Sequence, residues 1–327
     1  MVKPGFCSVI IVFKDAEKFV KPCLDSIFAQ GLHKDDYEVL IVDSMSKDKS
    51  IETAEVLLKA NNVSYKIFKN PKLLLAAGWN IGLSQAKGDY VIRPDAHCIL
   101  DKAYITAGIA CLKKDPDLAG VGGVLQTRSD GFWGRMIAIV LSNPIGVGGA
   151  RFRTGVKEAV YTDTIVYGVY RKQAFDEAGL LNESMARNQD IDLHKRMIEK
   201  GYKLLTSPVL KAVYFSRSNL SGFLKQGFWN GYWVTYAWAG YFRHFAPLFF
   251  VVLIAALGVI SWRLLVVFLI FYMSVLLSFY VKLSLVMNPA ILLGVGLLTF
   301  GLHLVYGLGS IAGLLSSFVK SFLKRKA

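Results

Sequence analysis

Three aspartates come at or just after the ends of short apolar runs in the first hundred residues: Asp15, Asp43 and Asp95. The runs are rich in Val and Ile, which is typical of buried parallel strands. Because the carboxyl ends of such strands meet at one edge of the sheet, where ligands bind, the three carboxylates are expected at a common site. Each aspartate taken alone could equally be a loop residue or a helix cap.

The last of these acids begins a pair of candidate metal ligands, Asp95 and His97. Residues two apart in an extended chain project to the same side, so both side chains can reach one ion. Imidazole is a better ligand for manganese than for magnesium, so the pair favours Mn²⁺, with Mg²⁺ as the alternative. The competing interpretation is an Asp that caps a strand end beside a surface histidine.

The elements that must position these residues alternate between strand and helix at short spacing. Apolar runs predict strands over 8–13, 38–42, 65–68 and 90–93. Helical periodicity predicts helices over 17–30, 51–60 and 73–86. This alternation predicts an α/β fold with a doubly wound, mostly parallel sheet. Residues 101–218 are less regular, and a helix is expected from near Asp190 to Gly201.

The composition of the 327 residues narrows the class of partner. A net charge of +14 suits an anionic partner, and a hydrophobic fraction of 54% is high for a soluble protein. Because no stretch alternates basic and aromatic residues on a plausible nucleic-acid-binding element, a membrane surface or a diphosphate substrate is expected and nucleic acid is not. The four cysteines are scattered singly, which predicts free thiols and no zinc site.

Three apolar runs near the C-terminus approach or exceed the length that crosses a bilayer: 245–260, 264–281 and 290–319, with the last crossing over 290–312. Before them, 219–243 mixes aromatics with a few cations, which predicts amphipathic interfacial helices, or alternatively a helix packed on the preceding domain. The expected domains are 1–218, 219–243 and 244–319, followed by a basic tail over 320–327.

Positive charges on both sides of the apolar runs bear on the orientation. Arg217, Lys225 and Arg243 precede the first run, which places 1–218 on the cytoplasmic side of a multi-pass protein of the cell membrane. The basic tail favours the same side, and this requires an even number of crossings. Since three runs are counted, either one run does not cross or the tail breaks the rule.

Five motifs follow one another in an order typical of a known family: Ser8–Asp15 (SVIIVFKD), Ile41–Asp48 (IVDSMSKD), Ala77–Leu83 (AGWNIGL), Gly88–His97 (GDYVIRPDAH) and Gly179–Pro208. Over about residues 6–215 the chain resembles the inverting glycosyltransferase family 2, which has the GT-A fold. Two further runs are similar to the subgroup of bacterial exopolysaccharide enzymes of the succinoglycan ExoA type: Asn143–Arg153 (NPIGVGGARFR) and Asp163–Tyr170 (DTIVYGVY).

This resemblance implies a nucleotide-sugar donor and the residues that bind it. Asp43 is expected to accept a hydrogen bond from a uracil ring, beside Ser44, where the family commonly has a second Asp. The other residues expected near the nucleotide are Phe13, Asp15, Glu17, Lys72, Gly78, Asn80 and Asp95.

The chemistry of such a donor gives the remaining residues their expected roles. A nucleotide sugar breaks at its anomeric carbon and leaves a diphosphate, whose charge a divalent cation stabilises. The Asp95 and His97 pair stands where the family usually has Asp-x-Asp. The attacking hydroxyl needs a base, and by resemblance this is Asp190, with Gln189 replacing the usual Glu. A helix N-terminus also favours acids, which alone could explain Asp190 or Asp192.

The sequence thus predicts a metal-dependent, inverting hexosyltransferase that uses a UDP-sugar and a lipid-linked or polysaccharide-precursor acceptor. Gln226–Trp229 carries only half of the Gln-x-x-Arg-Trp motif of processive synthases, so transfer of a single sugar is expected. Two alternatives stay open. One is an enzyme like a sugar-nucleotide pyrophosphorylase, although the loop after the first strand is not Gly-rich. The other is a membrane scaffold that has kept the fold and lost the chemistry.

Overall fold

The computed structural model describes residues 3–238, 240–283 and 288–326. The chain forms two compact units. Unit 1 comprises Met1–Gln126 and Arg151–Phe215, and unit 2 comprises Thr127–Ala150 and Ser216–Ala327. The predicted boundary at 218 does not by itself separate them, because a segment from the middle of the chain, 127–150, belongs with the C-terminal helices.

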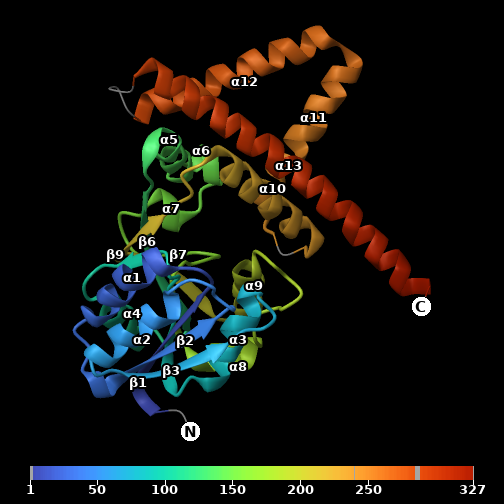
Figure 1. Ribbon diagram of the computed structural model, residues 1–327. Helices are drawn as coiled ribbons and strands as arrows, with labels where there is room; N and C mark the ends of the chain where they lie inside the picture. Colours follow the sequence, from blue (N-terminus) through green and yellow to red (C-terminus); the bar gives the residue numbers. More distant parts are fainter. Residues whose placement is uncertain (1–2, 239, 284–287, 327) are drawn as a thin grey trace. The chain divides into compact units, whose positions relative to one another are not determined.

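The first half of unit 1 is a parallel sheet whose strands follow one another in the order β3-β2-β1-β4. Its strands are β1 (Lys3–Phe13), β2 (Tyr37–Asp43), β3 (Ser64–Lys69) and β4 (Gly88–Ile92). The helices between them are α1 (Glu17–Phe28), α2 (Ser50–Ala60) and α3 (Leu75–Gln85), with a short η1 (Lys34–Asp36) before β2 (Figure 1). The strands and helices predicted for the first hundred residues are therefore confirmed to within a few residues.

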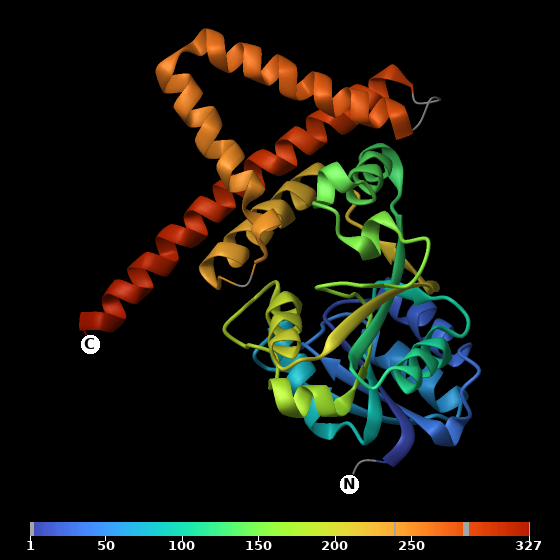
Figure 2. The ribbon, with the colours of Figure 1, turned by 180° about the vertical axis from the view of Figure 1, so that it is seen from behind.

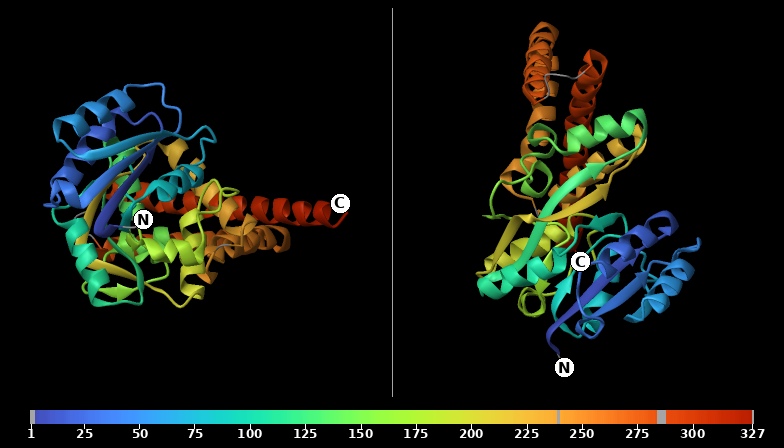
Figure 3. Two further views of the ribbon diagram at one scale, coloured as in Figure 1. Left: turned by 90° about the horizontal axis from the view of Figure 1, so that it is seen from below. Right: turned by 90° about the vertical axis from the view of Figure 1, so that its left-hand side faces the viewer.

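The second half of the sheet adds strands that pair mainly antiparallel, β8 (Val169–Arg171), β6 (Leu118–Arg128), β9 (Lys203–Phe215) and β5 (Cys98–Leu100), with β7 (Val160–Tyr161) beside β9. Its helices are α4 (Tyr104–Lys114), α7 (Arg151–Thr154), α8 (Lys172–Ala178) and α9 (Gln189–Glu199). The α/β class is confirmed, but the twisted sheet is mixed and only four strands keep the predicted parallel order (Figure 3).

Glycines explain why the long strand β6 is not evident from the sequence. Gly120, Gly122 and Gly123 interrupt its apolar pattern, yet they are needed there because neighbours occupy the space of a side chain. A Cβ at Gly120 would lie 2.5 Å from the ring of Tyr170, and one at Gly123 would overlap the carbonyl group of Leu210.

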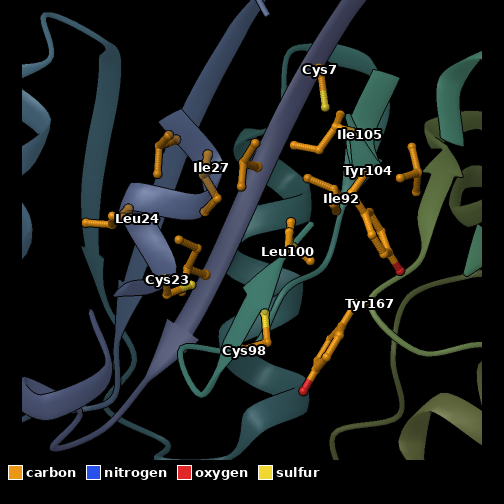
Figure 4. Close-up of a cluster of buried hydrophobic side chains, with 14 of the residues drawn as sticks. Cys7, Cys23, Leu24, Ile27, Ile92, Cys98, Leu100, Tyr104, Ile105 and Tyr167 are labelled. Atoms are coloured by element: carbon orange, nitrogen blue, oxygen red, sulfur yellow. The ribbon is translucent and has the colours of Figure 1, made fainter. Parts of the chain in front are cut away.

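Alternate residues of β1 serve two separate cores, as expected for a strand covered on both faces. Val9, Ile11 and Phe13 pack into one apolar cluster, while Ile10 and Val12 pack into the other. Figure 4 shows the first cluster, in which Cys7, Cys23 and Cys98 lie among the aliphatic side chains. All four cysteines of the chain are free thiols, as predicted.

Unit 2 is helical. Its elements are α5 (Gly131–Leu141), α6 (Pro144–Val147), α10 (Leu220–Tyr236), η2 (Phe242–Phe245), α11 (Ala246–Ile260), α12 (Trp262–Leu283) and α13 (Pro289–Lys326). Three stretches are long and apolar enough to cross a membrane: Phe242–Ile260, Trp262–Lys282 and Pro289–Phe322. The predicted tail over 320–327 continues α13 as far as Lys326, and residue 327 and the side chains of 323–326 lie outside the described part of the chain.

Helix α5 explains the assignment of 127–150 to unit 2. Met136, Ile137 and Val140 on one face of α5 are buried in a cluster with residues of α10, α12 and α13, including Phe223 and Leu298. The chain therefore leaves the sheet after β6 to add a helix to the apolar bundle, and it returns to unit 1 at α7. The residue spacing within 131–141 does not by itself indicate that α5 packs against α10, α12 and α13.

Helices α10 and α13 approach each other closely along glycines, and they run side by side in both Figures 1 and 2. A side chain at Gly231 would overlap the carbonyl oxygen of Tyr306, and Gly309 and Gly313 meet the carbonyls of α10 in the same way. Two hydrogen bonds cross the contact, from Thr235 Oγ1 to the Ser310 carbonyl (2.8 Å) and from Ser310 Oγ to the Gly231 carbonyl (3.3 Å). Small residues that let backbones approach are typical of helix contacts in membranes.

Substitution of Gly231 by Ala is expected to destabilise unit 2, because the new methyl group overlaps the Tyr306 carbonyl and the helices must separate. Overpacking of this kind typically costs about 1–3 kcal/mol. Thermal unfolding of the purified protein in detergent measures the effect. Gly301→Ala is the matched control on the same pair of helices, since its Cβ would meet Leu224 at an ordinary 3.5 Å. Equal melting temperatures for the two variants would contradict the prediction.

Candidate active site

The turn after β4 carries the two predicted metal ligands. Asp95 bridges to Val12 of β1, and Ala96 between the two ligands is buried, whereas Asp95 and His97 are each half-buried. This alternation indicates that both side chains project to the same face, as residues two apart should. The His97 ring packs against the ring of Phe19 with centroids 4.3 Å apart.

The charges around Asp95 show which distant residues the fold brings to it. Burial raises the pKa of the Asp95 carboxyl, interactions with Arg93 and His97 oppose that rise, and the Asp190 carboxylate adds to it. Asp190 therefore lies within electrostatic range of Asp95, although it belongs to a different part of the sequence. The guanidinium of Arg93 rests over the Trp79 ring, 4.9 Å from its centroid. Arg93 is a site residue that the sequence analysis did not select.

Two loops beside the first strands hold the acids predicted to contact the nucleoside. The Asp15 carboxylate accepts a hydrogen bond from the Lys47 amide (2.8 Å), and the Asp43 carboxylate accepts one from the Ser46 amide (3.0 Å). The Glu17 amide donates to Asp48, and the buried Phe13 accepts from Ser44 through its carbonyl. These bonds tie the loop after β1 to the loop after β2. The residues predicted to contact the nucleoside therefore also support the backbone that would hold its nucleobase.

Three residues predicted near the nucleotide, Lys72, Gly78 and Asn80, have structural partners within the protein. Lys72 forms an ion pair with Glu183 (2.6 Å). The Asn80 side chain donates to Glu183 and to the Leu181 carbonyl, and its oxygen accepts from the Leu181 amide. A Cβ at Gly78 would lie 2.5 Å from Val12, so glycine is required for α3 to approach β1. These three residues fasten α3 to its neighbours, and their contact with a nucleotide stays a prediction.

Glu183 is a residue that sequence reasoning missed. Hydrogen bonds from Lys72 and Asn80 lower the pKa of its carboxyl, so it stays ionised and holds the 181–183 segment against α3. Glu183 lies in the motif Gly179–Pro208, in which the sequence pattern indicates only Asp190 and Asp192. The ion pair joins residues distant in sequence, so local spacing does not indicate it.

The N-terminus of α9 carries Asp190 and Asp192, which have different surroundings. Asp192 forms an ion pair with Arg196 (2.9 Å), and Arg196 also donates to the Leu180 carbonyl. Asp192 thus supports the helix and the segment before it. The Asp190 carboxylate accepts a hydrogen bond from its neighbour, the Ile191 amide. Among the residues that the structure describes, Asp190 forms no ion pair, in contrast to Asp192.

A buried histidine underlies Asp190 one turn further along α9. The His194 ring contacts the Tyr170 hydroxyl at Nε2 (2.8 Å) and the Thr164 hydroxyl at Nδ1 (3.0 Å), so it joins α9 to β8 and to the segment before it. Burial lowers the pKa of His194 to about 4, with opposing contributions from Asp190 and Asp163 and a further lowering by Arg93. The ring is therefore neutral at neutral pH. Its position four residues after Asp190 is the signal that could have identified it.

Asp95 and His97 would bind a divalent ion only together with a substrate. Within the described ranges, no group of three or more His, Cys, Asp or Glu side chains could hold a metal on its own. Asp95 and His97 would supply two ligands on one face. The nearby carboxylate of Asp190 would attract the same cation. Phosphate oxygens and water would have to complete the coordination, as is usual where a metal bridges protein and substrate phosphates.

Comparison with known proteins settles the family to which this arrangement belongs. The model of glycosyl transferase family 2 matches residues 8–179, which include the two loops and the Asp95 turn. The chain belongs to this family. It is accordingly a glycosyltransferase, as the motif order predicted.

Curated relatives extend the match beyond the family model. The chain is 32% identical over 228 residues to a dolichyl N-acetyl-alpha-D-glucosaminyl phosphate 3-beta-D-2,3-diacetamido-2,3-dideoxy-beta-D-glucuronosyltransferase of Methanococcus voltae, a match that covers 68% of this chain and 70% of that protein. It is 27% identical over 198 residues to the succinoglycan biosynthesis protein ExoA of Rhizobium meliloti, over 59% of this chain and 58% of ExoA. The resemblance to ExoA is thereby confirmed.

A solved structure supports the fold over most of the length. The mannosyltransferase PcManGT from Pyrobaculum calidifontis, determined with GDP-Man and Mn²⁺, matches 94% of this chain and 86% of its own with a TM-score of 0.62. At 16% identity this likeness establishes the fold alone. Together with the family match it confirms the predicted GT-A fold.

Acid is expected to destabilise the protein through His194. In the unfolded chain a histidine titrates near pH 6.5, whereas the folded state holds the pKa at about 4, so the unfolded state binds more protons between these values. Stability is therefore complete above pH 6.5 and falls as the pH drops toward 4, by about 2–3 kcal/mol in total. Melting temperatures across this range would show the loss.

The variant His194→Gln is expected to lose this part of the acid sensitivity, because glutamine does not titrate. His33→Gln is the control, since His33 is an exposed histidine and its replacement leaves the effect of His194 in place. An unchanged slope of melting temperature against pH in His194→Gln would exclude His194 as the source.

Proposed function

We propose that this protein is an inverting, metal-dependent glycosyltransferase that moves one hexose from a UDP-sugar to a lipid-linked or polysaccharide-precursor acceptor. The observation that carries the proposal is the meeting of Asp95 and Asp190, one after β4 and the other at the start of α9, within electrostatic range of each other. Such a transfer needs a carboxylate that holds the donor's metal ion and a base that takes the acceptor's proton, and Asp95 and Asp190 would supply them.

On the donor side, Asp43, Asp15 and Glu17 lie in the loops that would surround the nucleoside. Asp95 and His97 would hold a divalent ion, and with imidazole as one ligand we favour Mn²⁺. When bound, such an ion supplies positive charge to the diphosphate that leaves. Arg93 adds a permanent positive charge beside the same carboxyl.

On the acceptor side, Asp190 acts as the general base. The hydroxyl oxygen of the acceptor attacks the anomeric carbon while its proton passes to the Asp190 carboxylate. The bond from the anomeric carbon to the phosphate oxygen breaks, and its electron pair leaves with the nucleoside diphosphate. Attack from the face opposite the leaving group inverts the anomeric centre. The neutral His194 ring beneath Asp190 is held by Tyr170 and Thr164 and does not compete for this proton.

Two observations support a membrane-associated acceptor. Three stretches of unit 2 are long and apolar enough to cross a bilayer. The relative from Methanococcus voltae is named for a dolichyl phosphate-linked sugar, and ExoA is named for succinoglycan biosynthesis. We therefore infer a multi-pass protein of the cell membrane, with unit 1 on the cytoplasmic side because basic residues precede the first apolar stretch.

Replacement of Asp190 by Asn is expected to lower turnover about 10²–10⁴-fold, the usual contribution of a general base. Release of UDP from a panel of UDP-sugars in the presence of Mn²⁺ measures it, with little change expected in the KM for the donor. Asp192→Asn is the matched control on the same turn, and it should lower stability more than turnover because it removes the Arg196 ion pair. Full activity of Asp190→Asn would remove the base assignment, and no activity in the unmodified protein would favour an inactive scaffold.

The identity of the ligand at position 97 is expected to set the metal preference. His97→Asp replaces an imidazole by a carboxylate, which suits magnesium better. Its activity with Mg²⁺ relative to Mn²⁺ should rise several-fold above that of the unmodified enzyme, and EDTA should abolish the activity of both. A metal preference that does not change in His97→Asp would argue against His97 as a ligand.

A further inference from the structure

Arg153 stands out among the basic residues of unit 1 because its guanidinium has a buried nitrogen without a hydrogen-bond acceptor in the described part of the chain. It lies over the rings of Tyr214 and Phe152, with its Cζ atom 5.1 and 5.5 Å from their centroids. Its Nη1 atom is buried and makes no hydrogen bond within residues 3–238, 240–283 and 288–326. In the same ranges Arg153 forms no ion pair. A buried guanidinium nitrogen without an acceptor is costly, so such groups normally face an anion.

The position of Arg153 relates it to the reacting residues. Tyr214, whose ring the Arg153 guanidinium covers, pairs across β9 and β5 with Cys98, the residue after His97. Tyr167 is buried and adopts a left-handed backbone conformation (φ 47°). Burial raises the pKa of the Tyr167 hydroxyl, the Asp95 carboxylate adds to the rise, and the Arg153 charge opposes it. One hydroxyl thus interacts with both residues. In Figure 4 the Tyr167 ring lies near Cys98, which follows His97 in the sequence.

The place of Arg153 in the chain relates it to the apolar helices. Arg153 belongs to α7, at which the chain re-enters unit 1 after α5 and α6. Helix α5 is buried against α10 and α13, and the His303 ring of α13 contacts the Ile145 carbonyl of α6 (2.9 Å). Only residues 148–150 separate α6 from α7. The segment that presents Arg153 to the site is therefore anchored at its other end in the apolar bundle.

We propose that Arg153 binds the phosphate group of a phosphate-linked acceptor lipid, on the acceptor side of the proposed active site. A guanidinium offers paired donors that match two phosphate oxygens, and stacking on aromatic rings keeps this fork oriented. In the proposed site, the metal ion at Asp95 and His97 and the charge of Arg93 already neutralise the donor diphosphate. A further cation at Arg153 would therefore bind a second anion. This inference rests on the proposed function, because it assumes that the acceptor enters beside Asp190.

The test measures binding of farnesyl phosphate to the full-length protein in detergent micelles, with Mn²⁺ and UDP present. Arg153→Gln is expected to weaken this binding at least tenfold and to leave the Kd for UDP within about threefold. Arg153→Lys, which keeps the charge without the paired donors, should give an intermediate loss. Arg151→Gln is the matched control, since Arg151 lies on the same short helix and is exposed, and it should bind both ligands normally.

Three results would overturn the inference. Unchanged farnesyl phosphate binding in a folded Arg153→Gln, or in Arg153→Lys if the first variant does not fold, excludes the contact. A loss of UDP binding in place of farnesyl phosphate binding assigns Arg153 to the donor. If inorganic phosphate binds as tightly as farnesyl phosphate, so that the prenyl chain adds no affinity, the site serves free phosphate. Because binding needs no turnover, these results are independent of UDP release, whose failure would instead refute the proposed function.

Discussion

The site depends on the approach of two carboxylates that repel each other. Asp95 and Asp190 lie close enough for the charge of one to raise the pKa of the other, in surroundings where burial already disfavours the ionised form. Two ionised carboxylates in a poorly solvated site repel each other, and nearby positive charge stabilises them. Arg93 supplies such a positive charge in the protein itself. The same field would attract a divalent ion and, through it, an anionic donor, so the constraint that costs stability is also what prepares the chemistry.

The two halves of the sheet divide the task of holding these acids. The parallel half ends in the loops of Asp15 and Asp43 and in the Asp95 turn, which β1 supports through Val12. The antiparallel half contributes β8, against which the buried His194 positions the start of α9. A neutral histidine suits this role because it bonds two hydroxyls without placing another charge beside Asp190. In the proposed mechanism, acceptor chemistry and donor chemistry are thus carried by different strands that share one sheet.

Unit 2 shows a different way of bringing helices together. Glycines on α10 and α13 let carbonyl groups of one helix touch the backbone of the other, and Thr235 and Ser310 close the contact with hydrogen bonds. Apolar side chains alone give little preference for a partner helix in lipid, so close backbone packing and polar bonds decide the pairing. Helix α5 joins this bundle from the middle of the chain, which links the segment before Arg153 covalently to it.

Local patterns in the sequence were sufficient for the first hundred residues, the apolar helices, the free cysteines and the family, because each depends on residue type at short spacing. They also selected Asp95, His97 and Asp190 as candidates. They did not reveal β6, whose glycines hide a strand, nor the place of α5, since both follow from contacts with distant residues. Tertiary structure alone shows that Lys72 and Asn80 bind Glu183, that His194 supports α9, and that Arg153 lies near Tyr167. Electrostatic and packing contacts between remote segments have no signature in either segment by itself, so only the folded chain decides them.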